Sequence, residues 1–395
     1  MPREFGGVPV AGARLYDPAD PGFGGRAFEV YRVLRDHHPV YFCAGRNCHL
    51  LSRYEDVRAA ASDPATFSSE RTSISQGLLP MIQQMDPPEH DVLRRMGRRP
   101  FSPRRVAALE GRIRAVAAGL LDPLRSGQEV DLLRVLAAEL PSRIMAELIG
   151  IPEERRPTFL EWTEAMVGAD PHGEVDTTPF AGIYGEFAKL LAERRERRAA
   201  DTMSELLEAE EDGWRLRDEE LLGFCFQLVV AGNDTTMNLI GNGAVLLARD
   251  RELRHELARR PSLIPAAVEE ILRLESPVQA LPRRLTRAVS LHGVEVPAGS
   301  EVMLLFGSAN RDDRVFPDPD RFDLGRRGAR HLAFGHGTHY CLGAHLARLE
   351  ARVAFEELLS RFPDFALLAE PELVPSAWAR ARVAVPVALG RDGGA

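Results

Sequence analysis

The chain has few of the sequence features that are typical of secreted and membrane proteins. Four cysteines are spread over 395 residues, too few and too scattered for a disulfide framework, and no pair of them has zinc-type spacing. The N-terminal residues lack the continuous apolar segment of a signal peptide or an anchor helix. We therefore expect a protein of the reducing cytoplasm that is neither exported nor bound to a membrane.

An excess of positive charge is also missing. The 50 lysines and arginines are outnumbered by 58 aspartates and glutamates, which gives a net charge of -8. This balance offers no general attraction for nucleic acid or for an anionic membrane, so neither is an expected partner. In contrast, 45% of the residues are apolar, enough for a large buried core.

Helical periodicity dominates from about residue 28 to residue 273, with proline and glycine interruptions. Strand patterns come mainly from 289–306 and 373–389, with N-terminal strands near 39–52. No repeat and no long linker divides the chain. We predict a mainly α fold, a single domain over residues 1–395 with a large helical part and a small β-rich portion.

Three late strands and one loop are specific expectations. The strands are expected at Val289–Val296, with a turn at His292-Gly293, at Glu301–Phe306 and at Ala381–Leu389. The polar stretch at 169–179, ADPHGEVDTTP, is expected to be a surface connector, and a lid over a pocket is the alternative.

The decamer FGHGTHYCLG, residues 334–343, places Cys341 among three glycines directly before a helix expected over Leu342–Leu349. Gly335 and Gly337 allow a positive φ and the close approach of a flat partner. The free N–H groups and the dipole of a helix start favour a thiolate at Cys341.

Three interpretations of Cys341 compete. A single buried cysteine is more often an inert apolar residue than a ligand. A nucleophile would need an oriented base, but His339 lies only two residues away and no Asp or Asn partner is apparent nearby. Metal ligation remains, and a lone cysteine suits an axial ligand of haem iron.

A second polar motif lies inside a long apolar segment, in LVVAGNDTTMNLI, residues 228–240. Asp234 and Thr235 are adjacent and therefore about 100° apart around a helix axis, so they can flank one groove without facing each other. Taken alone, the pair is explained by a threonine hydroxyl bonded to the carbonyl of Ala231 and an aspartate at the surface.

Two further pairs have helical spacing. Glu270 and Arg273 are three residues apart, where a surface ion pair of little energetic value is the ordinary explanation. His90 and Arg94 lie one turn apart and could both point at one carboxylate, although solvated helix residues would show the same spacing.

Taken together, these motifs resemble the cytochrome P450 family, the thiolate-ligated haem monooxygenases. The residues that match the haem-ligand signature are Phe334, Gly335, Gly337, His339, Cys341 and Gly343. Those that match the oxygen-activating helix are Ala231, Gly232, Asp234, Thr235 and Thr236. The resemblance implies a haem b cofactor with Cys341 as the proximal iron ligand, Phe334 packed near the thiolate and His339 at a haem propionate.

By the same resemblance, Thr235 orders a water beside bound dioxygen and Asp234 relays protons inward. Gly232 leaves room for the oxygen, within a local bulge of the helix. The residues that would hold the haem propionates are His90, Arg94 and Arg283, with Arg284 as the neighbouring alternative to Arg283. The residues that would form a buried charge cluster for folding and haem retention are Glu270, Arg273 and Arg321.

The resemblance implies a monooxygenase that inserts one atom of O2 into a hydrophobic small or medium-sized substrate. We expect electrons from a separate ferredoxin and ferredoxin reductase, because the chain has no room for a fused reductase. The arginines expected on a basic face for an acidic ferredoxin are Arg95, Arg98, Arg99, Arg348 and Arg352.

The alternatives are a peroxide-driven peroxygenase, a class that tends to lose the acid-alcohol pair, and a non-enzymatic haem carrier or gas sensor. The residues expected in the substrate pocket are Leu78, Leu79, Phe224, Gln227, Leu228, Val278, Leu281 and Trp378.

Overall fold

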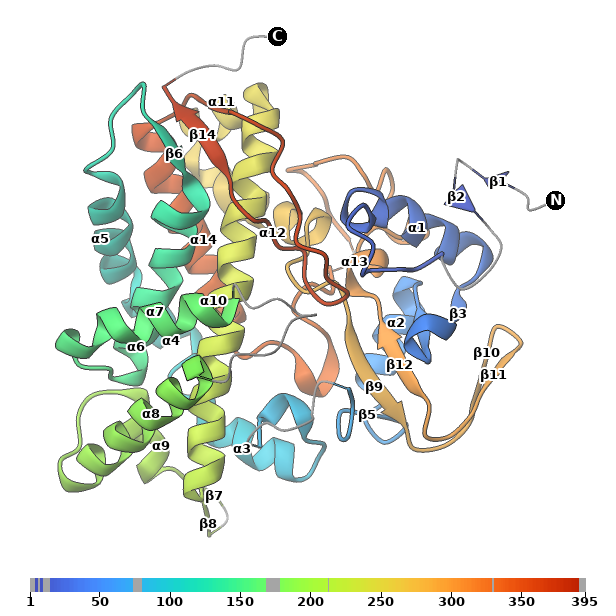
Figure 1. The fold of residues 1–395 in the computed structure, drawn as a ribbon, viewed down its shortest axis with the longest axis horizontal. Coiled ribbons are helices and arrows are strands. Elements are labelled where there is room, and N and C mark those ends of the chain that lie inside the picture. Colours follow the sequence, from blue (N-terminus) through green and yellow to red (C-terminus); the bar gives the residue numbers. More distant parts are fainter. Residues whose placement is uncertain are drawn as a thin grey trace. The chain divides into compact units, whose positions relative to one another are not determined.

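The computed structural model describes residues 4–5, 8–9, 15–73, 80–167, 178–211, 213–328 and 330–390. The chain forms two compact units, each assembled from segments that are far apart in the sequence (Figure 1). Unit 1 contains residues 1–76, 241–341 and 367–385, and unit 2 contains residues 77–240, 342–366 and 386–395. The prediction that the chain acts as one domain stays a prediction.

Unit 1 is built on a five-stranded sheet with the order β3-β4-β12-β9-β5. Its strands are β3 (Val40–Cys43), β4 (Cys48–Leu51), β5 (Phe67–Ser68), β9 (Leu281–Leu285) and β12 (Glu301–Leu304). β12 runs parallel to β4 and antiparallel to β9, so it joins the early and late parts of the chain. A separate hairpin pairs β10 (Val289–Leu291) with β11 (Val294–Val296).

Side chains along β12 point alternately to the two faces of the sheet, and helices cover both faces. Val302 packs in an apolar cluster with Val57 of α2 (Tyr54–Ser62), whereas its neighbour Met303 packs with Val30 of α1 (Phe23–His37). Successive strand side chains point to opposite faces, so an uninterrupted apolar strand is buried on both. The other helical elements of unit 1 are η1 (Ala44–Arg46), α11 (Arg251–Arg259), η5 (Pro261–Leu263), α12 (Ile264–Leu274), α13 (Phe306–Ala309) and η6 (Gly337–His339).

Unit 2 is mainly helical. Its helical elements are η2 (Ile82–Gln84), α3 (Glu89–Gly97), α4 (Pro103–Ala108), α5 (Glu110–Leu121), η3 (Leu133–Ala138), α6 (Glu139–Ile149), η4 (Glu153–Arg155), α7 (Arg156–Val167), α8 (Thr178–Glu196), α9 (Thr202–Glu208) and α14 (Ala344–Arg361). The long helix α10 (Asp218–Arg249) carries residues of unit 2 up to Ile240 and of unit 1 from Gly241.

The remaining strands form small sheets. A three-stranded sheet has the order β13 (Phe365–Leu367), β14 (Pro386–Leu389), β6 (Glu129–Asp131). Two hairpins pair β1 (Glu4–Phe5) with β2 (Val8–Pro9), and β7 (Glu210–Glu211) with β8 (Trp214–Arg215).

The predicted mainly α class with a small β-rich portion is confirmed. The hairpin at 289–296 turns at His292 and Gly293, whose φ values of 52° and 78° both lie in the left-handed region, as a tight two-residue turn requires. The C-terminal strand is shorter than expected and begins at Pro386, because Arg382 makes only an isolated bridge to Leu373. β9, with a proline and two arginines, was not predicted as a strand.

Two predictions from the sequence concern the segment at 169–179 and the location of the protein. The stretch at 169–179, expected to be a surface connector or a lid, lies outside the described residues, except for Thr178 and Pro179, which begin α8. Within the described ranges, no helix is both long and apolar enough to cross a bilayer. The expected cytoplasmic location stays a prediction.

Candidate functional site

The loop that carries Cys341 is closed tightly by its backbone in unit 1. The Cys341 N–H donates to the carbonyl of Phe334 with an N···O distance of 2.8 Å. Gly335 and Gly337 have φ values of 71° and 67°, which side-chain-bearing residues rarely adopt. A Cβ at Gly337 would lie 2.7 Å from the carbonyl oxygen of Ala61, at the end of α2. Two glycines of the motif are therefore required by the backbone itself.

The helix after Cys341 begins two residues later than expected. α14 starts at Ala344, with Gly343 as its N-cap, and the Ala347 N–H donates to the Gly343 carbonyl at 2.9 Å. The expectation of a helix from Leu342 was wrong, because φ and ψ of −84° and 6° at Gly343 are not helical. Cys341 precedes the first helical turn rather than starting it.

The donor set around Cys341 fits haem better than it fits a metal ion held by several protein ligands. Cys341 is partly exposed, whereas Cys43, Cys48 and Cys225 are buried. Burial raises the pKa of Cys48 and of Cys225 to about 12, so both stay protonated and are poor ligands. Among the described residues, no group of three or more His, Cys, Asp or Glu side chains could hold a metal ion. A porphyrin would bring its own nitrogen ligands, so Cys341 would need to supply only one thiolate.

The two candidate propionate contacts on β9 have different surroundings, and both roles stay predictions. The Arg283 side chain is buried, and its Nη1 donates to the Pro282 carbonyl at 2.7 Å. The Arg284 guanidinium instead donates to two exposed backbone carbonyls, those of Arg71 and Gly299, each at 2.7 Å. These two bonds occupy the Arg284 guanidinium.

The two histidines expected at propionates are both hydrogen-bonded to protein groups. His339 Nε2 lies 3.0 Å from the Ser69 hydroxyl. His90 is 1% exposed on α3, its Nδ1 lies 2.9 Å from Asp91 Oδ1, and burial lowers the pKa of its imidazole. A neutral imidazole has a single N–H, which the contact with the Asp91 carboxylate uses, so only a protonated His90 could also donate from Nε2 to a propionate. The propionate roles of His90, Arg94 and His339 stay predictions.

On α10 the acid and the alcohol of the motif have different surroundings. The Thr235 hydroxyl donates to the Ala231 carbonyl at 2.6 Å, the local bond expected for an isolated threonine. α10 is α-helical throughout, so the expected bulge is absent from it. Asp234 is not a free surface group: burial raises the pKa of its carboxyl, although Asn238 Nδ2 donates to its Oδ1 at 3.1 Å.

Gly232 has a packing reason of its own. A Cβ at this position would lie 2.4 Å from Cε of Met145 on α6. The glycine therefore leaves room for the end of the Met145 side chain. The suggested roles of Gly232 and Ala231 beside dioxygen stay predictions.

Comparison with known proteins decides the family. The cytochrome P450 family model matches residues 183–366. The chain is 40% identical to cytochrome P450 107B1 of Saccharopolyspora erythraea, over 83% of this chain and 85% of that protein. The chain belongs to the cytochrome P450 family.

This P450 also matches other bacterial relatives along nearly its whole length. It is 39% identical to the vitamin D(3) 25-hydroxylase of Pseudonocardia autotrophica, over 96% of this chain and 98% of that one. The solved structure of CYP109E1 from Bacillus megaterium in complex with testosterone is 31% identical, with a TM-score of 0.86, covering 94% of this chain and 100% of that one. The chain is therefore a P450 monooxygenase with the fold of its family.

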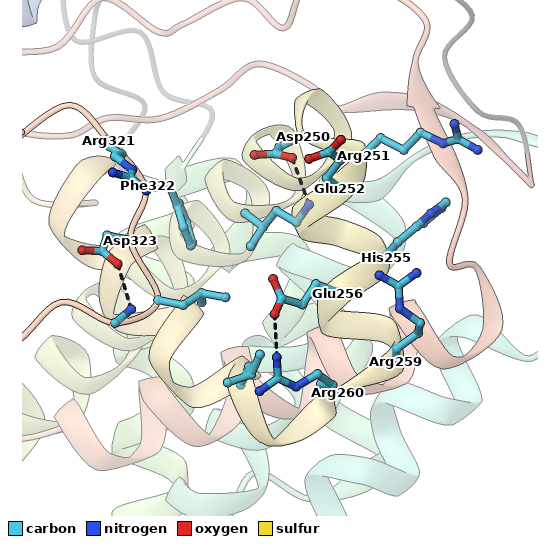
Figure 2. Close-up of a pocket in the computed structure, with 14 residues that line it drawn as sticks. Asp250, Arg251, Glu252, His255, Glu256, Arg259, Arg260, Arg321, Phe322 and Asp323 are labelled. Carbon is cyan, nitrogen blue, oxygen red and sulfur yellow. Dashed lines mark hydrogen bonds and ion pairs between the residues drawn. The ribbon is translucent and has the colours of Figure 1, made fainter.

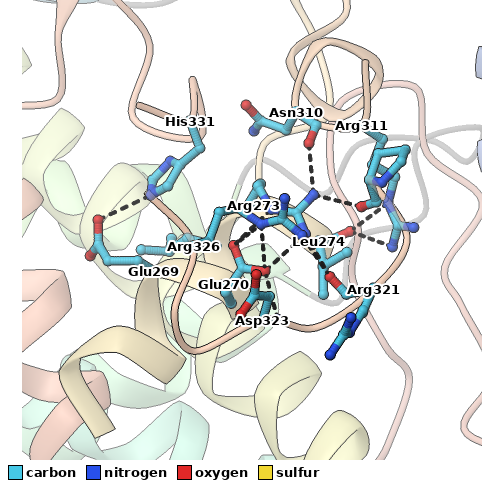
Figure 3. Close-up of polar contacts among 12 residues, drawn as sticks. Glu269, Glu270, Arg273, Leu274, Asn310, Arg311, Arg321, Asp323, Arg326 and His331 are labelled. Carbon is cyan, nitrogen blue, oxygen red and sulfur yellow. Dashed lines mark hydrogen bonds and ion pairs between the residues drawn. The ribbon is translucent and has the colours of Figure 1, made fainter. Parts of the chain in front are cut away.

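The buried charge cluster of the P450 contains a different arginine from the one expected. Nε and Nη2 of Arg273 donate to the two carboxylate oxygens of Glu270 at 2.8 and 2.9 Å, and both residues are buried. Arg326 Nε lies 3.1 Å from both oxygens. Arg321 contributes only its backbone carbonyl, 3.1 Å from Arg273 Nη2, and its guanidinium points away (Figure 3). The assignment of the Arg321 side chain to the cluster was wrong, and Arg326 takes its place.

The Arg321 side chain lines an open surface hollow of about 1040 Å³ in unit 1 (Figure 2). α11 forms one wall of this hollow and residues 321–325 form the other. Charged groups of both signs surround it, including the Glu256–Arg260 ion pair at 2.8 Å. None of the residues expected in the substrate pocket lines it, so it is not the predicted substrate site.

The expected pocket residues stay predictions. Leu78 and Leu79 lie outside the described residues. Phe224 is 1% exposed, and its ring lies against Gly97, where a Cβ would be 2.1 Å from it. The side-chain Oε1 of Gln227 accepts the Gln83 backbone N–H at 3.3 Å.

The others are divided between the units. Leu228 lies in unit 2, and Val278, Leu281 and Trp378 lie in unit 1. The Trp378 ring lies under the Arg46 guanidinium, 5.2 Å from ring centre to Cζ.

Two of the arginines expected on the basic face form ion pairs with carboxylates of the same chain. Arg95 forms an ion pair with Glu211 at 2.5 Å, and Arg352 pairs with Glu110 at 2.6 Å. Arg98 and Arg99 are exposed at the end of α3. They are the arginines of this set best placed to attract an acidic partner.

Proposed function

We propose that this P450 uses haem b, ligated by Cys341, to insert one atom of O2 into a hydrophobic small or medium-sized substrate. The observation that carries the proposal is the acid-alcohol pair on α10, with the Asp234 carboxyl partly buried and its pKa raised beside Thr235. Oxygen activation consumes protons, so a partly buried acid that can take up and release one serves it. A peroxide-driven enzyme, the second candidate, does not need such a relay.

Bound haem would supply thiolate-ligated iron, whose electron-rich sulfur ligand favours cleavage of the O–O bond. The chain's own task is then the delivery of protons. The Thr235 hydroxyl donates its hydrogen to the Ala231 carbonyl, so its oxygen lone pairs are left to accept a hydrogen bond from a water. Asp234 would pass a proton to that water, which Thr235 holds in place.

Replacing the two residues separates these roles. Thr235→Ala should keep substrate binding and the thiolate spectrum but divert reducing equivalents into hydrogen peroxide. Asp234→Asn should slow turnover by roughly 10²- to 10⁴-fold, the usual effect of losing a proton-transfer group. NADPH consumed, peroxide released and product formed are measured together.

Asp218→Asn is the matched control, because it removes an exposed carboxylate from the first turn of the same helix. Unimpaired coupling in both the Thr235 and Asp234 variants would return these residues to a packing role and leave the peroxygenase as the better candidate.

For the electron supply we propose a separate ferredoxin and ferredoxin reductase. The exposed Arg98 and Arg99 support an acidic ferredoxin, because complementary charge speeds association. For the substrate we propose a steroid or secosteroid, supported by a relative named as a vitamin D(3) hydroxylase and by a similar protein solved with testosterone.

Spectral titration of the ferric protein tests the substrate class. Testosterone and vitamin D3 should shift the haem spectrum at micromolar concentration, because a bound substrate would change the surroundings of the haem. A macrolide and a long-chain fatty acid serve as comparison compounds. A response to either of these, with no response to the steroids, would contradict the proposed class.

A further inference from the structure

Asn238 lies one turn after Asp234 on α10, within unit 2, and is 1% exposed. Its Nδ2 donates to Asp234 Oδ1 at 3.1 Å. Its own Oδ1 is buried and has no hydrogen-bond partner among the described residues. A buried amide that is only half satisfied is costly, so its position calls for an explanation beyond packing.

We propose that Asn238 is the positioning residue for Asp234: its amide holds carboxylate oxygen Oδ1 in place and leaves Oδ2 as the oxygen that exchanges the proton. The inference rests on the relay role proposed above for Asp234. It adds which oxygen carries the proton and which side chain decides this.

The chemistry of an amide suits both protonation states of the acid. When Asp234 is ionised, the Asn238 NH2 group donates to it, as in the structure. When Asp234 is protonated at Oδ2, its Oδ1 remains an acceptor, so the same N–H of Asn238 can keep its bond in this state.

The electrostatics of Asp234 agree with this role. Burial raises the pKa of the Asp234 carboxyl and the Asn238 hydrogen bond lowers it, with no contribution from a charged side chain of the described residues. Removing the Asn238 donor should therefore raise that pKa further.

Asn233 supplies a matched control on the same helix. It is also a buried amide, 4% exposed, but neither of its amide atoms has a hydrogen-bond partner in the part of the chain that the structure describes. Asn233→Leu and Asn238→Leu remove the same group from neighbouring turns, and only the second removes a bond to Asp234.

The first measurement is independent of turnover. Carboxyl ¹³C NMR of the ferrous carbon monoxide form, with Asp234→Asn to assign the signal, follows the titration of Asp234. Asn238→Leu should move its midpoint upward by about one pH unit, the size expected for a lost hydrogen bond to a charged group. Asn233→Leu should leave it in place.

The second measurement is a double-mutant cycle on peroxide release and product formation, with testosterone as the probe or the titration compound that gives the largest spectral shift. Asn238→Leu should lower coupled turnover at least tenfold in the parent and have no further effect in Asp234→Asn, because residues that act as one unit are not additive. Asn238→Ala repeats the deletion if the leucine variant does not fold.

The outcomes separate the two proposals. An unmoved Asp234 midpoint, or equal effects of Asn238→Leu in both backgrounds, overturns the positioning role while the relay stands. A fully active Asp234→Asn variant overturns the relay itself. A shifted midpoint together with a non-additive loss of coupling supports the positioning role.

Discussion

Cys341→Ala should abolish the red-shifted absorption band of the reduced, carbon monoxide-bound protein that gives the P450 family its name. The band requires a thiolate at the iron, and among the four cysteines only Cys341 is partly exposed. The thiols of Cys48 and Cys225 have pKa values raised to about 12 by burial, so neither can replace the lost ligand near neutral pH.

Cys225→Ala is the control, since it removes a fully buried thiol from α10 in unit 2. It should keep both the band and the haem content. The haem-ligand assignment fails if the Cys341 variant retains the band, or if the Cys225 variant loses it while still folded.

Glu270→Ala should lower the free energy of unfolding by about 3–5 kcal/mol, as expected when one partner of a buried ion pair is removed. Burial alone would raise the pKa of Glu270, but the hydrogen bonds from Arg273 and Arg326 outweigh it and hold the pKa below its usual value. The variant leaves the buried Arg273 guanidinium without its carboxylate. Urea unfolding of the haem protein measures the loss.

The matched pair Arg326→Ala and Arg321→Ala tests which arginine completes the cluster. Arg326→Ala should destabilise clearly, whereas Arg321→Ala should change the unfolding free energy by less than about 0.5 kcal/mol, as surface substitutions do. The reverse order would contradict the cluster in Figure 3.

The pH dependence of the Glu270 contribution has a definite sign. A carboxylate with a lowered pKa contributes stability that is present above its unfolded-state pKa and is lost as the pH falls through its folded-state pKa. The difference between the parent and Glu270→Ala should therefore be full at neutral pH and shrink in acid, below about pH 4.

Local geometry is what made much of the site predictable. The tight cysteine loop requires a positive φ at two positions. Glycine adopts such a φ without strain, so Gly335 and Gly337 mark the loop in the sequence. Residues three or four apart on a helix must meet, which is why Glu270 and Arg273 could be paired in advance. The Thr235 hydroxyl bond to Ala231 follows from the same spacing.

The prediction from the sequence failed where an interaction partner comes from a distant segment of the chain. Arg326 reaches Glu270 from 56 residues away, along a chain path that no local pattern specifies.

The amino-acid sequence by itself determined the mainly helical class, the cysteine loop and the order of the motifs, because these depend on periodicity, on backbone freedom and on residues that are neighbours along the chain. Only the tertiary structure decided which polar groups lose contact with water. Glu350 of α14, an ordinary helix carboxylate in the sequence, is 2% exposed, and burial raises its pKa to about 8. Asp234 likewise owes its raised pKa to burial, and desolvation depends on everything that packs around a group rather than on the residues beside it.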